Sequence, residues 1–377
     1  MVHVLAMVAL AVTCAASDAD LTFDRVKISD APYEAASAFD IDNDGNMDIV
    51  SGAYWYAGPG FESKHKICEV APQGEYYDDF GDFPMDVNGD GYTDIVTGGY
   101  WSCFLQWREN PKGQPVEWVT HNIGPTGSIE RPCFYDMDGD GFPEVIPNET
   151  KSLTIYKLVR DGQGKGTGEF QTFVVRNEAP GHGLGFGDVN ADGRVDILAT
   201  KGWFEAPATG LGGEWVWHEE WDLGSMSVPA VMIDVNGDKL DDIIVGQAHA
   251  YGLDWWEQTK DADGKRSWTK HEIDPGRSQY HDMMLADLDK DGDMELVTGK
   301  RYRAHNDGDP GAKDPIGVYY FEINGGQFKR VTLDYGPAET SSGLGIFCWV
   351  ADVDGNGWQD VVAPGKDGLY LFKGIGK

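Results

Sequence analysis

The 377-residue chain has few basic residues: 30 Lys and Arg stand against 63 Asp and Glu, and the formal net charge is −33. Nucleic acids and anionic membranes are bound through broad cationic surfaces that neutralise their phosphates. The charge therefore argues against both classes of partner.

Long apolar runs are also missing, except at the N-terminus, where residues 1–16 read MVHVLAMVALAVTCAA. The length of this run and the small residues at its end predict a secretory signal peptide, and hence a secreted, periplasmic or extracellular protein without membrane insertion. The start of the run lacks the Lys or Arg with which secretory signal peptides usually begin. A lipoprotein anchor on Cys14 is the alternative, although the preceding residues lack the expected Leu.

Cysteine is scarce, with Cys68, Cys103, Cys133 and Cys348 beyond the signal segment. Four cysteines permit two disulfides in three connectivities, and none has the spacing of zinc ligands. Cys133 and Cys348 precede repeat motifs closely, so we expect them to be small buried hydrophobic residues. The sequence also lacks a P-loop, a G-x-S-x-G elbow, an H-E-x-x-H motif, a C-x-x-C pair and any motif for an organic cofactor.

Glycine, by contrast, is abundant: 50 Gly and 18 Pro accompany 41% hydrophobic residues. This composition is typical of a folded, turn-rich β protein. One acidic motif recurs seven times at intervals of roughly 50 residues, as expected for propeller blades or a solenoid. In chain order the copies are DIDNDGNMDIV, DVNGDGYTDIV, DMDGDGFPEVI, DVNADGRVDIL, DVNGDKLDDII, DLDKDGDMELV and DVDGNGWQDVV.

Each motif carries oxygen-bearing side chains at positions 1, 3, 5 and 9, and Gly at position 6 in every copy except the fifth, which has Lys239. Oxygen ligands around a tight turn favour Ca²⁺, so we predict up to seven calcium loops, with Lys239 weakening or displacing the ion in the fifth. An EF-hand is excluded because position 12 is never Glu, and a tandem nonapeptide roll is excluded by the long period. The predicted ligands, loop by loop, are Asp40, Asp42, Asp44 and Asp48; Asp86, Asn88, Asp90 and Asp94; Asp136, Asp138, Asp140 and Glu144; Asp188, Asn190, Asp192 and Asp196; Asp234, Asn236, Asp238 and Asp242; Asp287, Asp289, Asp291 and Glu295; and Asp352, Asp354, Asn356 and Asp360.

The segments around each loop predict four strands per repeat, with alternating apolar residues bounded by Gly, Pro and Asp. The last repeat lacks a fourth strand, and residues 23–29, FDRVKIS, offer one that would close a ring. We therefore predict an all-β fold, a single seven-bladed β-propeller of four-stranded blades over residues 17–377, and we expect a monomer.

The D-x-[DN]-x-[DN]-G-x-x-[DE] hairpins resemble FG-GAP/VCBS repeats, the calcium-bearing blades also seen in integrin α-subunits. The resemblance covers essentially the whole chain beyond the signal segment. It implies the propeller fold, but it leaves function open, because similar propellers occur in adhesion modules, polysaccharide lyases and a fungal aldos-2-ulose dehydratase.

The strand order predicts a functional rim at the end opposite the calcium loops. His182 and His281 share one register, six residues before their loops, and Lys201 and Lys300 share another, thirteen residues after the loop starts. His121, His218 and His271 recur in one outer-strand position, so we expect them, and His65, to be structural.

A rim of this kind suits an oxygen-rich, anionic carbohydrate. In a β-elimination on a uronate-containing glycan, or in dehydration of a keto-sugar, a base removes the α proton, an acid protonates the leaving oxygen and cations neutralise the carboxylate. The predicted catalytic residues are His281 or His182 as base and Tyr251 or His249 as acid. Lys201, Lys300 and Arg301 are predicted to neutralise substrate charge, His305 and Arg131 to bind substrate, and Trp55, Trp101 and Trp203 to stack on sugar rings. A non-catalytic, calcium-stabilised carbohydrate- or protein-binding module remains the alternative.

Overall fold

The structure, a computed structural model, describes residues 20–377 and is built almost entirely from β-strands. The predicted signal peptide lies outside these residues. A four-residue 3-10 turn, η1 (Ala304–Asp307), is the one helical element of the described part. Residues 20–377 contain no helix with the length and hydropathy of a membrane span.

Most strands belong to four-stranded antiparallel sheets, which follow one another along the chain. Their members are β2 (Ser37–Phe39), β3 (Asp48–Ser51), β4 (Tyr54–Ala57) and β5 (Ser63–Lys66); β8 (Phe83–Met85), β9 (Asp94–Gly98), β10 (Phe104–Glu109) and β11 (Val119–Pro125); β12 (Ile129–Tyr135), β13 (Glu144–Glu149), β14 (Leu153–Arg160) and β15 (Gly166–Arg176); and β24 (Tyr280–Ala286), β25 (Glu295–Lys300), β26 (Ile316–Asn324) and β27 (Gln327–Gly336). A two-stranded ribbon, β6 (Pro72–Gln73) and β7 (Tyr76–Tyr77), interrupts the series.

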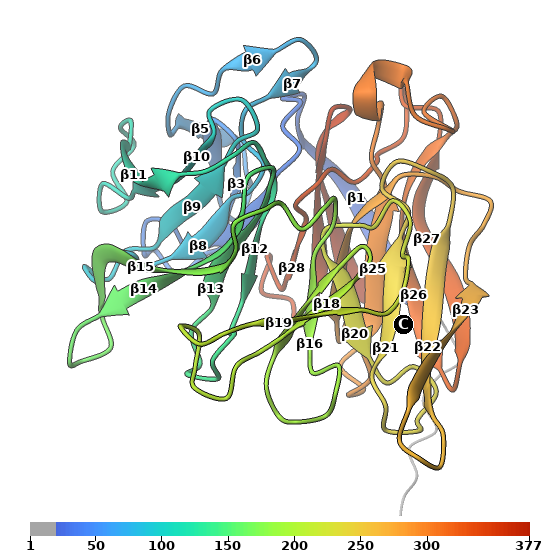
Figure 1. Cartoon of the computed structure of the whole chain (residues 1–377). Helices are drawn as coiled ribbons and strands as arrows, with labels where there is room; N and C mark the ends of the chain where they lie inside the picture. The colour runs from blue at the N-terminus through green and yellow to red at the C-terminus, as the bar shows by residue number, and fades with distance from the viewer. Residues whose placement is uncertain (1–19) are drawn as a thin grey trace, which may run out of the picture.

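An eight-stranded sheet consists of two antiparallel halves joined by a short parallel pair, β16 with β20. Its strands are β16 (Gly185–Gly187), β17 (Asp196–Ala199), β18 (Gly202–Glu205), β19 (Val216–Glu219), β20 (Ala230–Ile233), β21 (Asp242–Gly246), β22 (Leu253–Lys260) and β23 (Arg266–Glu272). Figure 1 shows the sheets arranged side by side around a common centre, from blue and green on the left to yellow and red on the right. The predicted all-β propeller is confirmed, whereas the number of seven blades stays a prediction.

The N-terminal strand closes the propeller, as predicted. β1 (Thr22–Ser29) pairs antiparallel with β30 (Gly368–Gly376), in a sheet completed by β29 (Asp360–Gly365) and β28 (Trp349–Ala351). The first and last described strands thus share one sheet, which removes a free edge from each.

Apolar side chains fill the spaces between neighbouring sheets. One buried cluster joins Cys133, Ile146 and Leu153 of one sheet to Ile197 and Phe204 of the next. The second strand of each sheet is buried along its whole length, because it is covered by a neighbouring sheet on either face. Cys133 and Cys348 are buried, as expected, and all four described cysteines are unpaired.

A repeated contact supports the outer strands. His121, His218 and His271 each lie against a tryptophan of the preceding strand and contact a glutamate through Nε2 at 2.7–2.8 Å. The structural role predicted for these histidines is confirmed, and His65 packs against Trp55 in the same way.

This packing corrects two predictions. Trp55 and Trp203 are 2% and 1% exposed, since each is covered by the histidine of its own sheet, so neither is available to stack on a sugar.

Candidate metal centre

Three side chains from three separate blades converge because they share one register. Glu130, His182 and His281 each stand six residues before the first Asp of their acidic loop, at the end of the inner strand opposite that loop. Inner strands surround the centre of a propeller, so this register directs equivalent positions toward one point. A fourth residue, His249, enters from the segment after β21.

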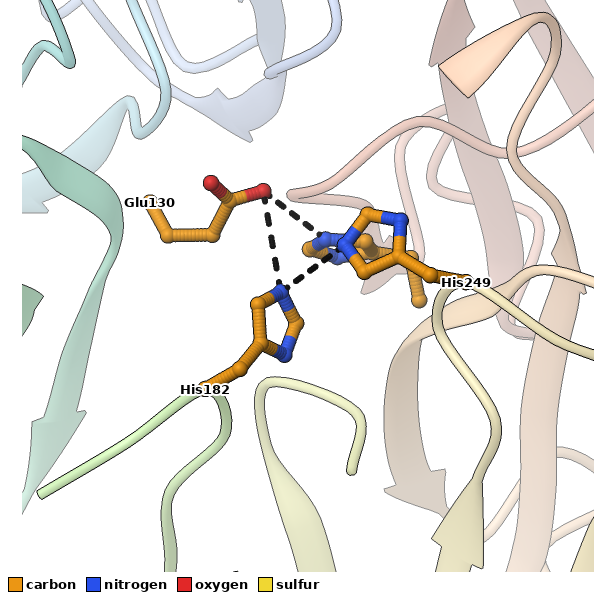
Figure 2. Close-up of side chains that lie close together, drawn as sticks. Glu130, His182 and His249 are labelled. Carbon is orange, nitrogen blue, oxygen red and sulfur yellow. Dashed lines mark hydrogen bonds and ion pairs between the residues drawn. The ribbon is translucent and has the colours of Figure 1, made fainter. Parts of the chain in front are cut away.

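The four side chains form a compact cluster, of which Figure 2 labels Glu130, His182 and His249. His182 Nε2 lies 3.0 Å from His249 Nε2, and His281 Nε2 lies 3.0 Å from Glu130 Oε1. His182 Nε2 and Glu130 Oε1 are 4.0 Å apart. One ligand atom from each of the four lies within 4.8 Å of all the others.

The hydrogen-bond partners of two histidines leave their Nε2 lone pairs facing each other. His182 Nδ1 lies 2.8 Å from the Met226 carbonyl, and His249 Nδ1 lies 2.8 Å from Asp309 Oδ2. Both partners accept hydrogen bonds, so Nδ1 carries the proton in each ring and the neutral ring has a lone pair on Nε2. Two lone pairs that face each other at 3.0 Å repel unless a proton or a metal ion lies near both.

The cluster fits a divalent transition metal. Imidazole nitrogens suit zinc, copper, iron and nickel, and three histidines with a carboxylate form a tetrahedral donor set. Ligands held at 2.0–2.1 Å in that geometry lie about 3.4 Å from one another, close to the spacings observed here. Burial lowers the pKa of His249 to about 4 and also lowers that of His281, so both rings stay neutral, as metal ligands must be.

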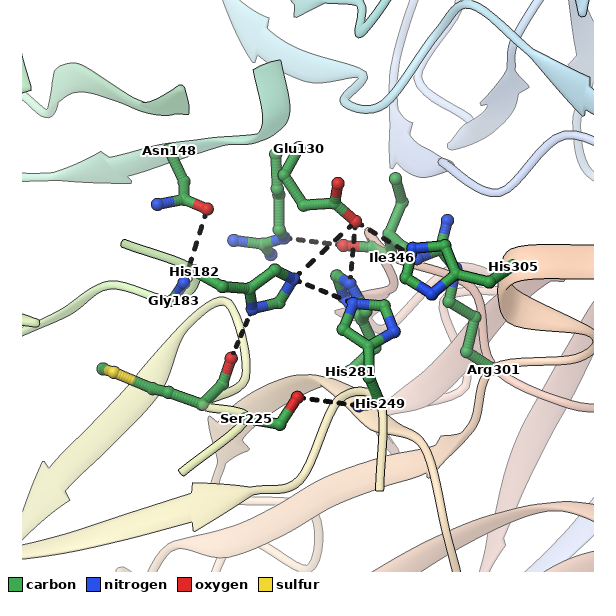
Figure 3. Close-up of polar contacts among 12 residues, drawn as sticks. Glu130, Asn148, His182, Gly183, Ser225, His249, His281, Arg301, His305 and Ile346 are labelled. Carbon is green, nitrogen blue, oxygen red and sulfur yellow. Dashed lines mark hydrogen bonds and ion pairs between the residues drawn. The ribbon is translucent and has the colours of Figure 1, made fainter. Parts of the chain in front are cut away.

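A second layer of side chains orients the cluster (Figure 3). Asp309 accepts from His249 through one oxygen and from His305 Nδ1 through the other, both at 2.8 Å. The His305 ring stacks on His249 with centroids 4.4 Å apart, while its side chain remains 63% exposed. A carboxylate that holds Nδ1 of a metal-binding histidine fixes both its tautomer and its orientation.

Backbone conformation places His305 at this position. Residues 303 and 305–307 have φ between 50° and 69°. This is the left-handed region of backbone conformation, which residues other than glycine rarely adopt. The turn also forms an ion pair between Arg303 and Glu75 beside the β6–β7 ribbon at 2.9 Å. In Figure 1 the ribbon and η1 both project from the upper end of the molecule.

Arg301 balances the carboxylates beneath the cluster. Its guanidinium donates to Glu34 Oε1 at 2.8 Å and to Glu130 Oε1 at 3.2 Å. Burial opposes ionisation of Glu130, but the His281 hydrogen bond and Arg301 outweigh it and hold the pKa of Glu130 well below its usual range. Arg301 is only 4% exposed, so it neutralises carboxylates of the protein and not, as predicted, those of a substrate.

Three further predicted side chains lie elsewhere. Lys300 is buried, donates to Ser278, Gln279 and the Gly311 carbonyl, and has its pKa lowered to about 8 by burial. Lys201 is exposed and paired with Asp222. The Tyr251 hydroxyl donates to Asp314 at 2.5 Å, so its proton is held by a carboxylate of the protein and it does not serve as the predicted acid.

Arg131 is buried and paired within the protein. It pairs with Asp282 at 3.0 Å and lines a mostly apolar cavity of about 380 Å³ between the inner strands. The predicted role of Arg131 in substrate binding has no support from this position.

Trp101 does remain available for a sugar ring. It is 41% exposed and packs beside Tyr100 and against Tyr76 of the β6–β7 ribbon. Among the three tryptophans predicted to stack on sugars, it is the one with an exposed ring.

The acidic loops have one repeated conformation. In all seven, the position 9 carboxylate accepts a hydrogen bond from the position 2 N–H at 2.8–3.2 Å, and the position 1 carboxylate accepts from the position 6 N–H. Lys239 adopts φ 71° and donates in the same way as the glycines. The fifth loop therefore retains the shared conformation.

Oxygen-only donors and an unpartnered buried oxygen, Asp352 Oδ1, fit a calcium ion. Calcium in these loops stays a prediction, and the third loop is the exception described below.

Three residue roles were not predicted from the sequence: Glu130 as a ligand, Asp309 as the carboxylate that positions His249, and Glu34 as a partner of Arg301. Glu34 and Glu130 stand in the same register as His182 and His281, so the repeat alignment alone could have indicated them. No pattern in the sequence indicates Asp309.

The fold and repeats define a β-propeller with acidic hairpin loops. A family model described as FG-GAP-like repeat matches residues 86–146 and 234–298. The chain thus carries FG-GAP-like repeats, as the sequence resemblance predicted.

The solved structures that resemble this chain are distant. An Agrocybe aegerita lectin that recognises non-reducing terminal N-acetylglucosamine shares 16% identity, with 94% of this chain and 90% of the lectin covered and a TM-score of 0.48. The rhamnogalacturonan lyase YesW shares 12% identity, with coverage of 93% and 72% and a TM-score of 0.44. Among curated proteins, none matches the sequence. These likenesses are too weak to assign an activity.

Proposed function

We propose that this protein is a metal-dependent carbon–oxygen lyase that acts on an oxygen-rich carbohydrate outside the cytoplasm. The observation that carries the proposal is the convergence of three histidines and Glu130 on one point at the end of the propeller opposite the acidic loops. The substrate classes that we favour are a uronate-containing glycan and a keto-sugar.

Both reactions remove a proton next to a carbonyl or carboxylate carbon and expel an oxygen from the next carbon. A divalent metal held by Glu130, His182, His249 and His281 would supply Lewis acidity toward the carbonyl or carboxylate oxygen by accepting it as an additional, fifth ligand. The metal would also take the Nε2 lone pairs, so these three histidines bind the metal in our proposal and are not the base or the acid.

His305 is the residue that we assign to proton transfer. Its Nδ1 is held by Asp309, and its exposed ring has Nε2 free to take the α proton and deliver it to the leaving oxygen. Trp101 and Tyr100, which are 41% and 37% exposed, offer apolar faces for a sugar ring.

The proposal is tested by incubating purified, metal-loaded protein with a panel of uronate-containing glycans and keto-sugars. A lyase produces an unsaturated product with new ultraviolet absorbance, and a dehydratase converts keto-sugars to dehydrated products visible by mass spectrometry. Recovery of unaltered sugar in every case, together with measurable sugar binding, would favour the non-catalytic binding module instead.

Replacing Asp309 with Asn should weaken metal binding by about 10–100-fold, because the amide no longer fixes the Nδ1–H tautomer of His249. Metal affinity is measured by competition with a chromophoric chelator. Asp314→Asn is the matched control, since Asp314 lies on the same segment but contacts Tyr251. Equal metal affinity in the two variants would show that Asp309 does not position the ligand.

A further inference from the structure

A lysine from the neighbouring strand lies among the carboxylates of the third acidic loop. Lys157 Nζ, from β14, lies 2.7 Å from Asp138 Oδ2, 2.6 Å from Asp140 Oδ2 and 2.8 Å from Glu144 Oε1. These carboxylates are positions 3, 5 and 9 of the loop, the oxygens predicted to bind calcium. The ammonium therefore occupies the centre of the predicted cage.

Strand register shows that this lysine is a substitution within the repeat. Val145, at position 10, pairs with Tyr156, and Lys157 is the next residue. The equivalent residues beside the first, second, fourth, fifth, sixth and seventh loops are Ala57, Glu109, Glu205, Glu257, Glu322 and Lys373. Four blades thus place a carboxylate where the third places an ammonium.

The glutamates at this position lie close to their loops. Glu109 accepts a hydrogen bond from Asn88 at 3.4 Å, and Glu257 accepts one from Asn236 at 3.1 Å. In these blades the strand adds negative charge beside a loop that is already acidic, which favours a bound cation. In the third blade the same position supplies the positive charge itself.

Basic side chains near the other loops are less well placed to take the position of a calcium ion. Lys112 lies 3.6 Å from Asp90, Lys373 lies 3.6 Å from Asp354, and Lys377 contacts Asp289. Arg194 reaches Asp192 and the strand residue Glu205. Among the described residues, none of these cations contacts more than one carboxylate of its loop.

We infer that Lys157 replaces calcium in the third loop, so that residues 136–144 are held by an internal ammonium and take no divalent ion. Ca²⁺ binds its oxygens at 2.3–2.6 Å, and an ammonium bonded to the same oxygens occupies that space and repels the ion. The inference does not require calcium in any other loop.

The placement of this lysine bears on the metal centre. β12 carries Glu130 at one end and leads into the third loop at the other. A loop closed by Lys157 would keep this strand in position whatever the calcium concentration.

The decisive experiment counts bound calcium by equilibrium dialysis of the full chain. Lys157→Glu, which introduces the residue found at the equivalent position of four other blades, should bind one calcium ion more than the unchanged protein. In the unchanged protein, Asp138→Asn should leave the count the same, whereas Asp90→Asn in the second loop should lower it by one. The Asp138→Asn measurement also serves if Lys157→Glu fails to fold.

An equal count in the unchanged protein and Lys157→Glu, or a loss of one ion in Asp138→Asn, would overturn the inference. If the unchanged protein binds no calcium while Lys157→Glu binds one, the role of Lys157 stands and the calcium prediction for the other loops fails.

Discussion

Replacing His182 with Ala should remove the transition metal from the purified protein and reduce turnover by about 10³-fold or more, because Lewis acidity contributes several kcal/mol to such reactions. His182 supplies one of the two Nε2 lone pairs that face each other at 3.0 Å. Metal content is measured by plasma mass spectrometry and turnover on the substrate found by the panel described above.

His271→Ala is the matched control for this variant. His271 is also a histidine with a carboxylate partner, Glu257, but it stacks on Trp255 in an outer strand. It should retain metal and turnover. If His182→Ala folds poorly, Glu130→Gln makes the same prediction with less loss of volume. Full metal content in both cluster variants would contradict the proposed ligand set.

Removing calcium should lower the melting temperature sharply, by on the order of 10 °C if several loops are occupied. An ion at a hundred times its dissociation constant stabilises the folded state by about 2.7 kcal/mol per site. Without it the loops hold clustered carboxylates: burial, followed by repulsion from neighbouring acids, raises the pKa of Asp94 and Asp196 to about 7. Differential scanning calorimetry with and without a calcium chelator measures the effect.

The chelator also binds transition metals, so the experiment is repeated with the His182→Ala variant. The same shift in both proteins, reversed by Ca²⁺ but not by Mg²⁺, assigns the effect to the acidic loops. A melting temperature that does not change in excess chelator would refute calcium stabilisation.

The fold could be predicted because its information is local and repeated. Each acidic loop specifies its own hydrogen bonds within nine residues, and the flanking apolar segments specify the strands on either side. Closure by residues 23–29 was predicted from the missing fourth strand of the last sheet, and the structure shows it with β1, Thr22–Ser29.

The metal centre could be predicted only in part. His182 and His281 share a register that points to the centre, and the structure brings them together with His249. Asp309 and the position of His305 depend on a left-handed turn in a long connection, which no repeat pattern specifies.

Burial explains the errors in the predicted substrate contacts. Lys300, Arg301 and Trp203 lie at the predicted end of the propeller or in the predicted strand. The sequence does not show, however, whether such a side chain faces solvent or a neighbouring blade. Glu34 and Glu130 pair with Arg301 from other blades, and His218 of the adjacent strand covers Trp203, so these side chains are occupied within the protein.

We propose that three histidines and a glutamate from separate blades hold one transition-metal ion. X-ray absorption at the edge of the metal found in the purified protein tests it directly. We expect one metal ion per chain with the scattering signature of several imidazole ligands and a mixed nitrogen and oxygen shell. A protein that takes up no transition metal, or one whose metal shows no imidazole scattering, would contradict it.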